Sequence, residues 1–439
     1  MQLQELFRDI EYTGTLPRGD AVTVIRDSRK FKPGAVFLCS CGAQYDSHDF
    51  AKTAIEQGAA LVVTQRPLGL AREVTVPDTV KAYALLCHNF FGRPAEKLRL
   101  VAVTGTNGKT TVTFLLKQIL EKAGYRCGLI GTIRSEVDRL EIPAKFTTPE
   151  PWDIDALFSR MVDAGCTFAL LEASSQALAQ LRLYGLTFEV GAFTNLTQDH
   201  LDYHKTMEAY FAAKRSLFDQ TKAAVVNLDD AYGRRLVSEI PAQKIMRYST
   251  AQDEAEITAK NVELRAGGVR FELVGHEFIQ RVQFPMPGSY SAHNALCAAA
   301  VALELGIAPP LVASALEAST GVEGRCEVLY SKKFTVICDF AHTADGITKV
   351  LSGLAPFVKG RLYVLFGCAG ERDATKRHDM ARAVLRYADE IILTSDNPRS
   401  ENPYHILEDA ESILRTGGKP YLVEVERRRA ITKALALLE

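Results

Sequence analysis

A buried-strand pattern that runs directly into a glycine loop is the feature that most constrains the fold of this chain. Residues 98–104 are rich in aliphatic and β-branched side chains and predict a strand. Residues 105–111 follow with two glycines, and the apolar spacing of residues 112–123 predicts a helix. A strand, a glycine loop and a helix in this order are typical of an α/β nucleotide-binding fold.

The composition of this loop suits the binding of phosphate groups. Backbone N–H groups exposed by glycines, together with the positive end of a helix dipole, attract phosphate oxygens. Lys109 would neutralise the terminal phosphates, and the Thr110 hydroxyl would coordinate Mg²⁺. The common phosphate-loop pattern has a glycine where this chain has Val103, so the match is to a shortened variant. A glycine turn with a solvated lysine is the alternative, which the flanking strand and helix disfavour. The predicted ATP-binding loop comprises Gly105, Thr106, Asn107, Gly108, Lys109, Thr110 and Thr111.

Length and charge restrict the possible partners. The 439 residues suffice for about three domains, and the 47% hydrophobic and 24% charged residues indicate an ordinary globular enzyme. Lys and Arg total 52 against 53 Asp and Glu, so no broad basic field exists that would bind nucleic acid or an anionic membrane. The first ten residues carry charges that a signal peptide excludes, and no apolar stretch is long enough to span a bilayer. We expect a cytoplasmic monomer without membrane insertion.

The nine cysteines are an odd number and are scattered through apolar segments. This pattern predicts buried thiols in a reducing compartment more than disulfides or a metal site. Cys39 and Cys41 form the one close pair, and their spacing does not match the usual zinc motifs.

The order of the predicted elements indicates three α/β domains. Residues 1–97 would form a small first domain, residues 98–323 a central domain with a mostly parallel sheet, and residues 324–439 a Rossmann-like third domain. The predicted strands cover residues 22–25, 60–63, 98–104, 129–130, 168–171, 223–226, 335–339, 362–366 and 390–394, with a helix at 49–58 and a hairpin within 257–284.

Polar clusters follow several of these strands, where parallel sheets present ligand-binding groups. Glu172 ends one strand and could serve Mg²⁺, whereas Ser174 or Ser175 could simply cap a helix. The segment 195–204 is dense in acceptors and imidazoles. The clusters 339–343, 367–373 and 395–401 also follow strands, and Arg399 could pair with a carboxylate or lie in an exposed turn.

Lys214 lies in a segment with the pattern of an amphipathic helix. For such a lysine, exposure to solvent is the default interpretation, and composition alone does not overturn it.

Taken in this order, the segments resemble the Mur ligases, which extend the peptide of the bacterial cell-wall precursor, and among them the type that adds the third amino acid. The resemblance covers nearly the whole chain, including Asp27-Ser28-Arg29 near the start, the loop 105–111 and Asp396-Asn397-Pro398-Arg399. It implies a first domain that binds a uridine nucleotide and a central ATPase-like domain.

The resemblance also implies roles for individual residues, which we keep as expectations. Lys109, His200 and Lys214 would be catalytic, with Lys214 carbamylated and therefore an anion. The metal ligands would be Thr110, Glu172, His200 and Lys214, near Asn195 and Asp199. The remaining implied contacts are Ser28, Thr147, Thr148, Ser174, Gln180 and Arg182 for the uridine substrate; Asn294, Arg325, Asp339 and His342 for ATP; and Arg372, Asn397 and Arg399 for the amino acid.

The function implied is an ATP- and Mg²⁺-dependent amide ligase of peptidoglycan synthesis, and hence of cell shape and division. It would add a diamino acid, with meso-diaminopimelate favoured over lysine, to UDP-N-acetylmuramoyl-L-Ala-D-Glu through an acyl phosphate. The alternatives are a folylpolyglutamate synthase-like ligase and a catalytically silent paralogue that binds a nucleotide sugar. Two departures from the family keep the silent paralogue open as an alternative. Gln176 stands where the family usually has histidine, and the chain ends at Glu439, before the family's usual last segment. We therefore expect a truncated third domain.

Overall fold

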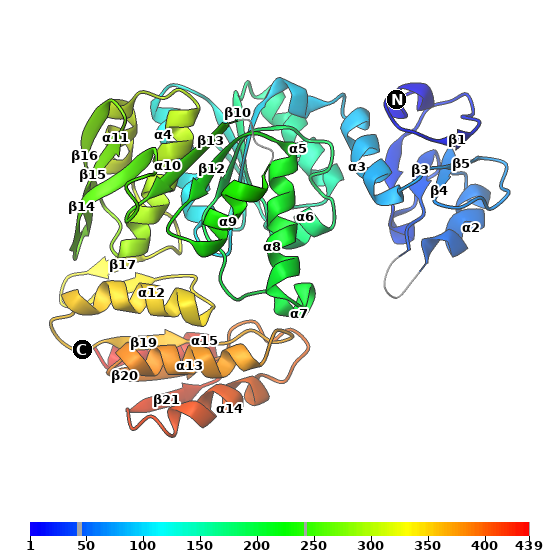
Figure 1. Ribbon diagram of the computed structural model, residues 1–439. Coiled ribbons are helices and arrows are strands. Elements are labelled where there is room, and N and C mark those ends of the chain that lie inside the picture. The colour runs from blue at the N-terminus through cyan, green and yellow to red at the C-terminus, as the bar shows by residue number, and fades with distance from the viewer. Residues whose placement is uncertain (42–45, 241–243, 439) are drawn as a thin grey trace. The chain divides into compact units, whose positions relative to one another are not determined.

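The computed structural model describes residues 1–41, 46–240 and 244–438. Glu439, at which the sequence ends, lies outside the described residues. The described chain is an α/β structure (Figure 1). It divides into two compact units. The first unit comprises Met1–Thr104, Gly124–Gly191 and Ser216–Lys222, and the second comprises Gly105–Ala123, Ala192–Arg215 and Ala223–Glu439. The predicted α/β class is confirmed, and the three domain boundaries stay predictions.

The first unit begins with a five-stranded sheet in the order β1-β5-β4-β3-β2. Its strands pair in parallel except for β1 and β5, which are antiparallel. The predicted helix at 49–58 is a short 3₁₀ turn, η2, followed by α2. The elements are α1 Leu3–Leu6, β1 Thr13–Gly14, β2 Thr23–Ile25, η1 Ser28–Lys30, β3 Ala35–Leu38, η2 Ser47–Phe50, α2 Ala51–Glu56, β4 Leu61–Thr64, β5 Glu73–Thr75, α3 Thr79–Phe90 and η3 Pro94–Lys97.

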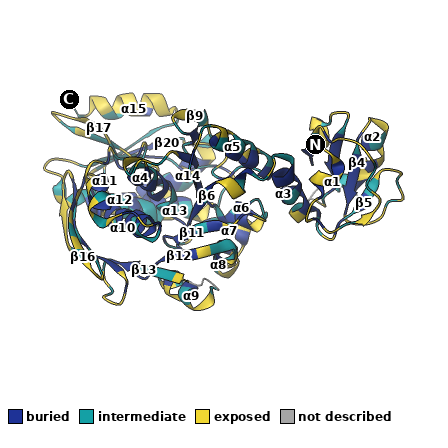
Figure 2. Ribbon diagram, turned by 90° about the horizontal axis from the view of Figure 1, so that it is seen from above, coloured by how far each residue is buried: buried dark blue, intermediate teal, exposed yellow. Residues whose placement is uncertain are grey.

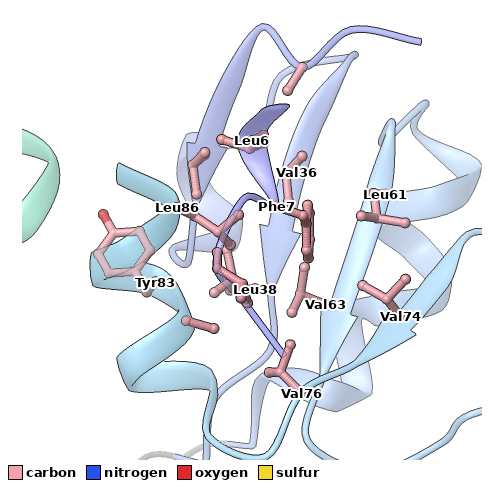
Figure 3. Close-up of a cluster of buried hydrophobic side chains, with 14 of the residues drawn as sticks. Leu6, Phe7, Val36, Leu38, Leu61, Val63, Val74, Val76, Tyr83 and Leu86 are labelled. Atoms are coloured by element: carbon pink, nitrogen blue, oxygen red, sulfur yellow. The ribbon is translucent and has the colours of Figure 1, made fainter. Parts of the chain in front are cut away.

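Alternate residues of β3 and β4 build the core of this small sheet. Val36 and Leu38 point to the same side as Leu61 and Val63, because neighbours two apart on a strand share a face. Helix α3 covers that side with Tyr83 and other apolar residues, as Figure 3 shows. The labelled members of this cluster are Leu6, Phe7, Val36, Leu38, Leu61, Val63, Val74, Val76, Tyr83 and Leu86.

The remainder of the first unit contains the strand that leads into the glycine loop. Strand β6 pairs in parallel with β10, and β10 in parallel with β7, whereas β8 and β9 are antiparallel additions. Strands β6 and β10 are buried almost along their whole length, which accounts for their unbroken apolar sequences. These elements are β6 Arg99–Thr104, β7 Cys127–Ile130, β8 Arg134–Val137, β9 Leu140–Pro143, α5 Pro151–Asp163, β10 Phe168–Glu172, α6 Ser175–Ala179, β11 Phe188–Phe193 and η4 Ser216–Gln220.

In the second unit, helices α10 and α11 pack beside strands β14 to β16 (Figure 1). Strands β12, β13 and β14 pair in parallel, and β14, β15 and β16 form an antiparallel meander. The predicted hairpin is therefore part of a three-stranded unit. The elements are α4 Lys109–Lys122, α7 Leu201–His204, α8 Met207–Arg215, β12 Thr221–Asn227, α9 Ala231–Glu239, β13 Lys244–Ser249, β14 Ile257–Arg265, β15 Gly268–Gly275, β16 Phe278–Phe284, α10 Ser289–Glu304 and α11 Pro309–Glu317.

The last part of the second unit contains a three-stranded parallel sheet, β19-β20-β21. The strand predicted at 335–339 is β18, which pairs antiparallel with β17 in a separate two-stranded sheet. Helix α15 is largely exposed, as its yellow ribbon in Figure 2 shows. The elements are β17 Glu327–Ser331, β18 Thr335–Cys338, α12 Ala344–Leu354, η5 Ala355–Phe357, β19 Tyr363–Phe366, α13 Thr375–Tyr387, β20 Glu390–Thr394, α14 Pro403–Leu414, β21 Tyr421–Glu424 and α15 Arg427–Ala436.

All nine cysteines are described and free, and seven of them are buried as predicted. Cys41 and Cys338 are exposed, which corrects the prediction for these two thiols. Among the described helices, none combines the length and the apolar character needed to cross a bilayer.

Candidate functional site

The glycine loop is held in a conformation that only glycine adopts easily. Gly105 has φ +148 and Gly108 has φ +91, and Gly108 is the N-terminal cap of α4. A Cβ atom at Gly105 would lie 1.9 Å from Thr194 Oγ1, and one at Gly108 would lie 2.4 Å from Asn294 Oδ1. Both glycines therefore allow close approach of neighbouring segments. The Nζ of Lys109 donates to the carbonyl oxygens of Gly105 and Thr106, at 2.9 and 3.0 Å.

The centre of the loop is fastened by the segment that follows β11. The backbone N–H of Asn107 donates to Asn195 Oδ1 at 3.0 Å, and its carbonyl accepts from Thr194 Oγ1 at 2.6 Å. The side-chain amide of Asn107 donates to Asp345 Oδ2 at 3.1 Å. The loop is thus tied to two other segments of the second unit, which restricts its movement.

Lys214 is fully buried, and the default interpretation of a solvated lysine is wrong. Its side chain is about 1% exposed, and its Nζ donates to the carbonyl oxygen of Gly105 at 2.7 Å. The same Nζ lies 4.7 Å from the ring centroid of Tyr210. Burial, with the charge of Lys109 as a second cause, lowers the pKa of Lys214 well below its ordinary value. An uncharged amine is therefore favoured at this position.

Asp199 is a buried carboxylate that lies beside one lysine and two histidines. Lys376, on α13, donates to one of its oxygens, and His342 Nε2 lies 3.8 Å from the other. Burial alone would raise the pKa of Asp199, but His200, Lys376 and His342 outweigh it and hold the pKa well below its ordinary value. The carboxylate is therefore ionised at neutral pH.

His200 has the protonation state that a metal ligand requires. Burial lowers its pKa to about 4 against the opposing effect of Asp199, and the charges of Lys109 and Lys376 act in the same direction as burial. The imidazole is consequently neutral near pH 7, with a lone pair free of a proton. Its backbone has φ +53, an uncommon conformation for a residue other than glycine.

Of two predicted ATP contacts, Arg325 approaches the start of α4 and Asp339 does not. Arg325 Nη2 donates to the Thr110 hydroxyl at 2.9 Å, and its guanidinium lies 4.7 Å from the ring of Phe340. Asp339 instead accepts the backbone N–H groups of Cys326 and Ala341, each at 2.7 Å. Asp339 therefore orders the turn after β18.

The residues predicted to hold the amino acid lie on neighbouring loops after β19 and β20. The backbone N–H of Gly370 donates to the carbonyl of Asn397 at 2.9 Å, which joins the two loops. Asn397 and Arg399 are exposed, and Arg399 has φ +54. Arg372 Nη1 donates to Asp202 Oδ2 at 3.1 Å. These guanidiniums are therefore presented at the ends of parallel strands, where ligands commonly bind.

In the first unit, Glu172 is fully buried at the end of β10 and receives two hydrogen bonds from one residue. The backbone N–H of Thr132 donates to Oε1 at 2.8 Å, and the Thr132 hydroxyl donates to Oε2 at 2.9 Å. The Thr132 and Thr147 hydroxyls lie 3.1 Å apart. A Cβ atom on Gly131 would lie 2.4 Å from Glu172 Oε1, so the carboxylate lies against glycine backbone.

Thr148 links several predicted substrate contacts. Its hydroxyl donates to the carbonyl of Glu172 at 2.6 Å and lies 3.1 Å from Ser174 Oγ. Ser174 also caps α6 by accepting the N–H of Ala177, so the capping interpretation is correct for this serine. Arg182 donates to the carbonyl of Thr148 at 2.7 Å. Its Nε and Nη2 donate to Gln180 Oε1, so four predicted substrate contacts, Thr148, Ser174, Gln180 and Arg182, lie in one network.

Ser28 lies in a different part of the first unit. It begins η1, where Asp27 caps the turn, and it lines a cavity of about 180 Å³. Two aromatic residues and three small or polar residues complete the wall, which suits a flat polar ring. The other lining residues are Phe37, Phe50, Thr53, Ala54 and Gln57.

Three residues near these groups escaped the sequence analysis: Thr132, Asp345 and Lys376. Asp345 lies two residues beyond the cluster 339–343, and Lys376 lies three residues beyond the cluster 367–373. Both residues lie within one helical turn of a predicted polar cluster, and this closeness in sequence could have identified them. Thr132 had no comparable signal, because an isolated threonine after a strand is common.

Comparison with known proteins decides the family. Residues 103–302 match the Mur ligase middle domain, residues 324–439 the Mur ligase glutamate ligase domain, and residues 23–87 the Mur ligase family catalytic domain. The chain is 40% identical to the UDP-N-acetylmuramoyl-L-alanyl-D-glutamate–2,6-diaminopimelate ligase 1 of Clostridium acetobutylicum, over 100% of this chain and 92% of that protein. This chain belongs to the Mur ligase family.

Other proteins similar to this Mur ligase agree with that assignment. The 2,6-diaminopimelate ligase of Geobacillus thermodenitrificans is 40% identical over 95% of this chain and 87% of its own length. A solved structure of a UDP-N-acetylmuramoyl-L-alanyl-D-glutamate–2,6-diaminopimelate ligase has a TM-score of 0.74 at 33% identity, covering 99% of this chain and 90% of that one.

The folylpolyglutamate synthase of Mycobacterium tuberculosis is also similar to this Mur ligase in structure. Its TM-score is 0.65 at 20% identity, covering 80% of this chain and 87% of that one. A likeness at this identity shows the fold alone. The folylpolyglutamate synthase-like alternative therefore has the shared fold in its favour and no stronger support.

Proposed function

We propose that this Mur ligase is an ATP-dependent enzyme that joins 2,6-diaminopimelate to UDP-N-acetylmuramoyl-L-alanyl-D-glutamate in the cytoplasm, as a monomer, during peptidoglycan synthesis. The observation that carries the proposal is the 40% identity, along the whole chain, to ligases that bear this name. The glycine loop, its lysine and the buried Lys214 agree with it. We keep 1–97, 98–323 and 324–439 as the proposed domains.

The proposed chemistry has two steps, because a carboxylate is a poor electrophile. In the first, a carboxylate oxygen of the dipeptide attacks the γ-phosphorus of ATP, the bond to the bridging oxygen breaks, and ADP leaves. In the second, the amine of diaminopimelate attacks the acyl carbon, inorganic phosphate leaves, and the amine loses a proton. Phosphoryl transfer of this kind depends mainly on positioning and charge neutralisation, which is the proposed task of Lys109.

The side chains near the loop suit Mg²⁺ on the condition that Lys214 carries a carbamate. A neutral lysine amine is a poor ligand for a hard cation, which prefers oxygen. CO₂ reacts with uncharged amines, and burial favours the uncharged form of Lys214. A carbamate on Lys214 would supply the missing oxygens beside the Thr110 hydroxyl and His200, and from the sequence we also expect Glu172 as a ligand. Mg²⁺ would offset the charge of the phosphates.

The proposed choice of amino acid depends on a carboxylate. Diaminopimelate has a second carboxylate at its far end, and a guanidinium can pair with it through two parallel hydrogen bonds. Arg372, Asn397 and Arg399 are the proposed contacts. The exposed position of Arg399 on the loop after β20 leaves its guanidinium available to such a ligand.

Phosphate release from ATP tests the proposed function. We expect release to require both the UDP-muramoyl dipeptide and diaminopimelate, and to fall at least 100-fold in Lys109→Ala. Lys122→Ala is the matched control, because Lys122 lies in the last turn of the same helix and donates to Ser314. Full activity of Lys109→Ala, or release that is independent of diaminopimelate, contradicts the proposal. Absence of phosphate release from the wild type in the presence of both cosubstrates would favour the silent paralogue.

A further inference from the structure

Two arginines from distant parts of the first unit share one carboxylate. Arg26 Nη2 lies 2.5 Å from Glu150 Oε2, and Arg182 Nη2 lies 3.0 Å from Glu150 Oε1. Each oxygen of the carboxylate thus receives one guanidinium. Arg26 follows β2, two residues before the cavity-lining Ser28, and Arg182 belongs to the network of predicted substrate contacts.

The charges at this cluster do not balance. Arg182 makes its other hydrogen bonds to neutral acceptors, the carbonyl of Thr148 and the amide of Gln180. Arg26 packs over the ring of Tyr83, 5.1 Å from its centroid. Among the described residues, Glu150 is the carboxylate paired with these two guanidiniums, so one positive charge is left without a partner. An arrangement of this kind attracts a further anion.

Glu150 is not committed to a local structural task. It occupies the N-terminal cap of α5, yet its side chain accepts no capping hydrogen bond from that helix. Its side chain is 25% exposed, and those of Arg26 and Arg182 are 34% and 15% exposed. The carboxylate can therefore turn away into solvent without breaking the helix, and a ligand from solvent can reach the guanidiniums.

We propose that Arg26 and Arg182 form a binding site for an anionic group of the nucleotide-linked substrate, and that Glu150 occupies this site until the substrate displaces it. The ligand group is a carboxylate or a diphosphate, because both offer oxygens that pair with two guanidiniums. This inference rests on the proposed function. It adds Arg26 as a substrate-binding residue and makes Glu150 an internal competitor of the substrate.

If Glu150 competes with the substrate, its substitution should have an effect opposite to the one expected if its carboxylate only joined two segments of the chain. Removing the charge of Glu150 removes the competing group but leaves both arginines, so Glu150→Gln is expected to bind UDP-muramoyl dipeptide 3- to 10-fold more tightly. Arg26→Gln is expected to bind it at least 10-fold more weakly, and Arg26→Lys should lie between because it keeps the charge without the planar fork. A clamp that merely joins two segments predicts weaker binding for Glu150→Gln.

Titration calorimetry on the full chain measures these affinities. Arg99→Gln and Glu189→Gln are the matched controls, because this pair also lies 2.5 Å apart at similar exposure, at the starts of β6 and β11. Both controls should bind like the wild type, and thermal unfolding verifies that every variant is folded. UDP-N-acetylglucosamine serves as a second ligand: tighter binding of both ligands to Glu150→Gln identifies the diphosphate, and tighter binding of the dipeptide alone identifies a carboxylate.

The results that overturn the inference differ from those that overturn the proposed function. If the wild type binds the dipeptide while Glu150→Gln binds it equally or more weakly, the competitor role is wrong. If Arg26→Gln binds like the wild type, Arg26 has no part in the site. If the wild type binds neither nucleotide sugar, the proposed function and this inference both fail.

Discussion

Substituting alanine for Gly108 tests two reasons why the loop requires glycine at this position. One is the positive φ of the backbone, and the other is the lack of space for a Cβ atom. Gly108 has φ +91, and a Cβ atom there would lie 2.4 Å from Asn294 Oδ1. Gly124, after the other end of α4, has φ +90, and a Cβ atom there meets no atom within 4 Å. The two glycines therefore impose the same backbone strain, and one of them adds a collision.

The two effects have different magnitudes and appear in different measurements. A left-handed conformation costs a residue with a Cβ atom roughly 1–2 kcal/mol, so both Gly108→Ala and Gly124→Ala should lower the free energy of unfolding by about that amount. The collision at Gly108 must displace Asn294 or the loop itself. A displacement of about 1 Å at a reacting group can reduce a rate about 100-fold, which corresponds to about 2.7 kcal/mol.

The assay compares unfolding in urea with kcat/KM for ATP in both variants. We expect Gly108→Ala to lose at least as much stability as Gly124→Ala, and a loss of about 100-fold in kcat/KM that is confined to Gly108→Ala. Equal kinetic losses would mean that strain transmitted through α4, and not the collision with Asn294, limits nucleotide use. Normal kinetics in Gly108→Ala would refute the assignment of this loop to ATP.

Three further predictions follow from buried or exposed charges. Lys214→Ala should lose activity and regain part of it with a short carboxylic acid that replaces the carbamate; a variant that keeps full activity contradicts carbamylation. The buried carboxyl of Asp155 lies 2.6 Å from His88, and His88→Leu leaves it without this partner. The variant should lose about 3–5 kcal/mol of free energy of unfolding in urea at pH 7. The control His276→Leu changes an exposed residue and should lose little. Burial raises the pKa of Asp155, so this deficit should shrink as the pH falls and the carboxyl becomes neutral; a deficit independent of pH contradicts the reasoning. Arg399→Ala should raise KM for diaminopimelate about 10-fold or more and leave KM for ATP unchanged, and equal changes in both constants would argue against a role in specificity.

Local sequence determined the elements that carry the candidate site. The apolar run at β6, the glycines after it and the apolar spacing of α4 predicted a strand, a loop and a helix because each depends on neighbours within a few residues. The same holds for β10 with Glu172 at its end and for the capping of α6 by Ser174. The family resemblance supplied further roles, including the reversal of the default interpretation of Lys214.

Only the tertiary structure decided how groups distant in sequence meet. Lys214 contacts Gly105, 109 positions earlier, and its burial depends on what packs around α8, which the pattern of α8 does not encode. Asn107 bonds to Asp345, 238 positions away, and Arg26 shares Glu150 with Arg182. A hydrophobic period records which face of an element is covered but not which partner covers it, and charge, burial and pKa depend on that partner.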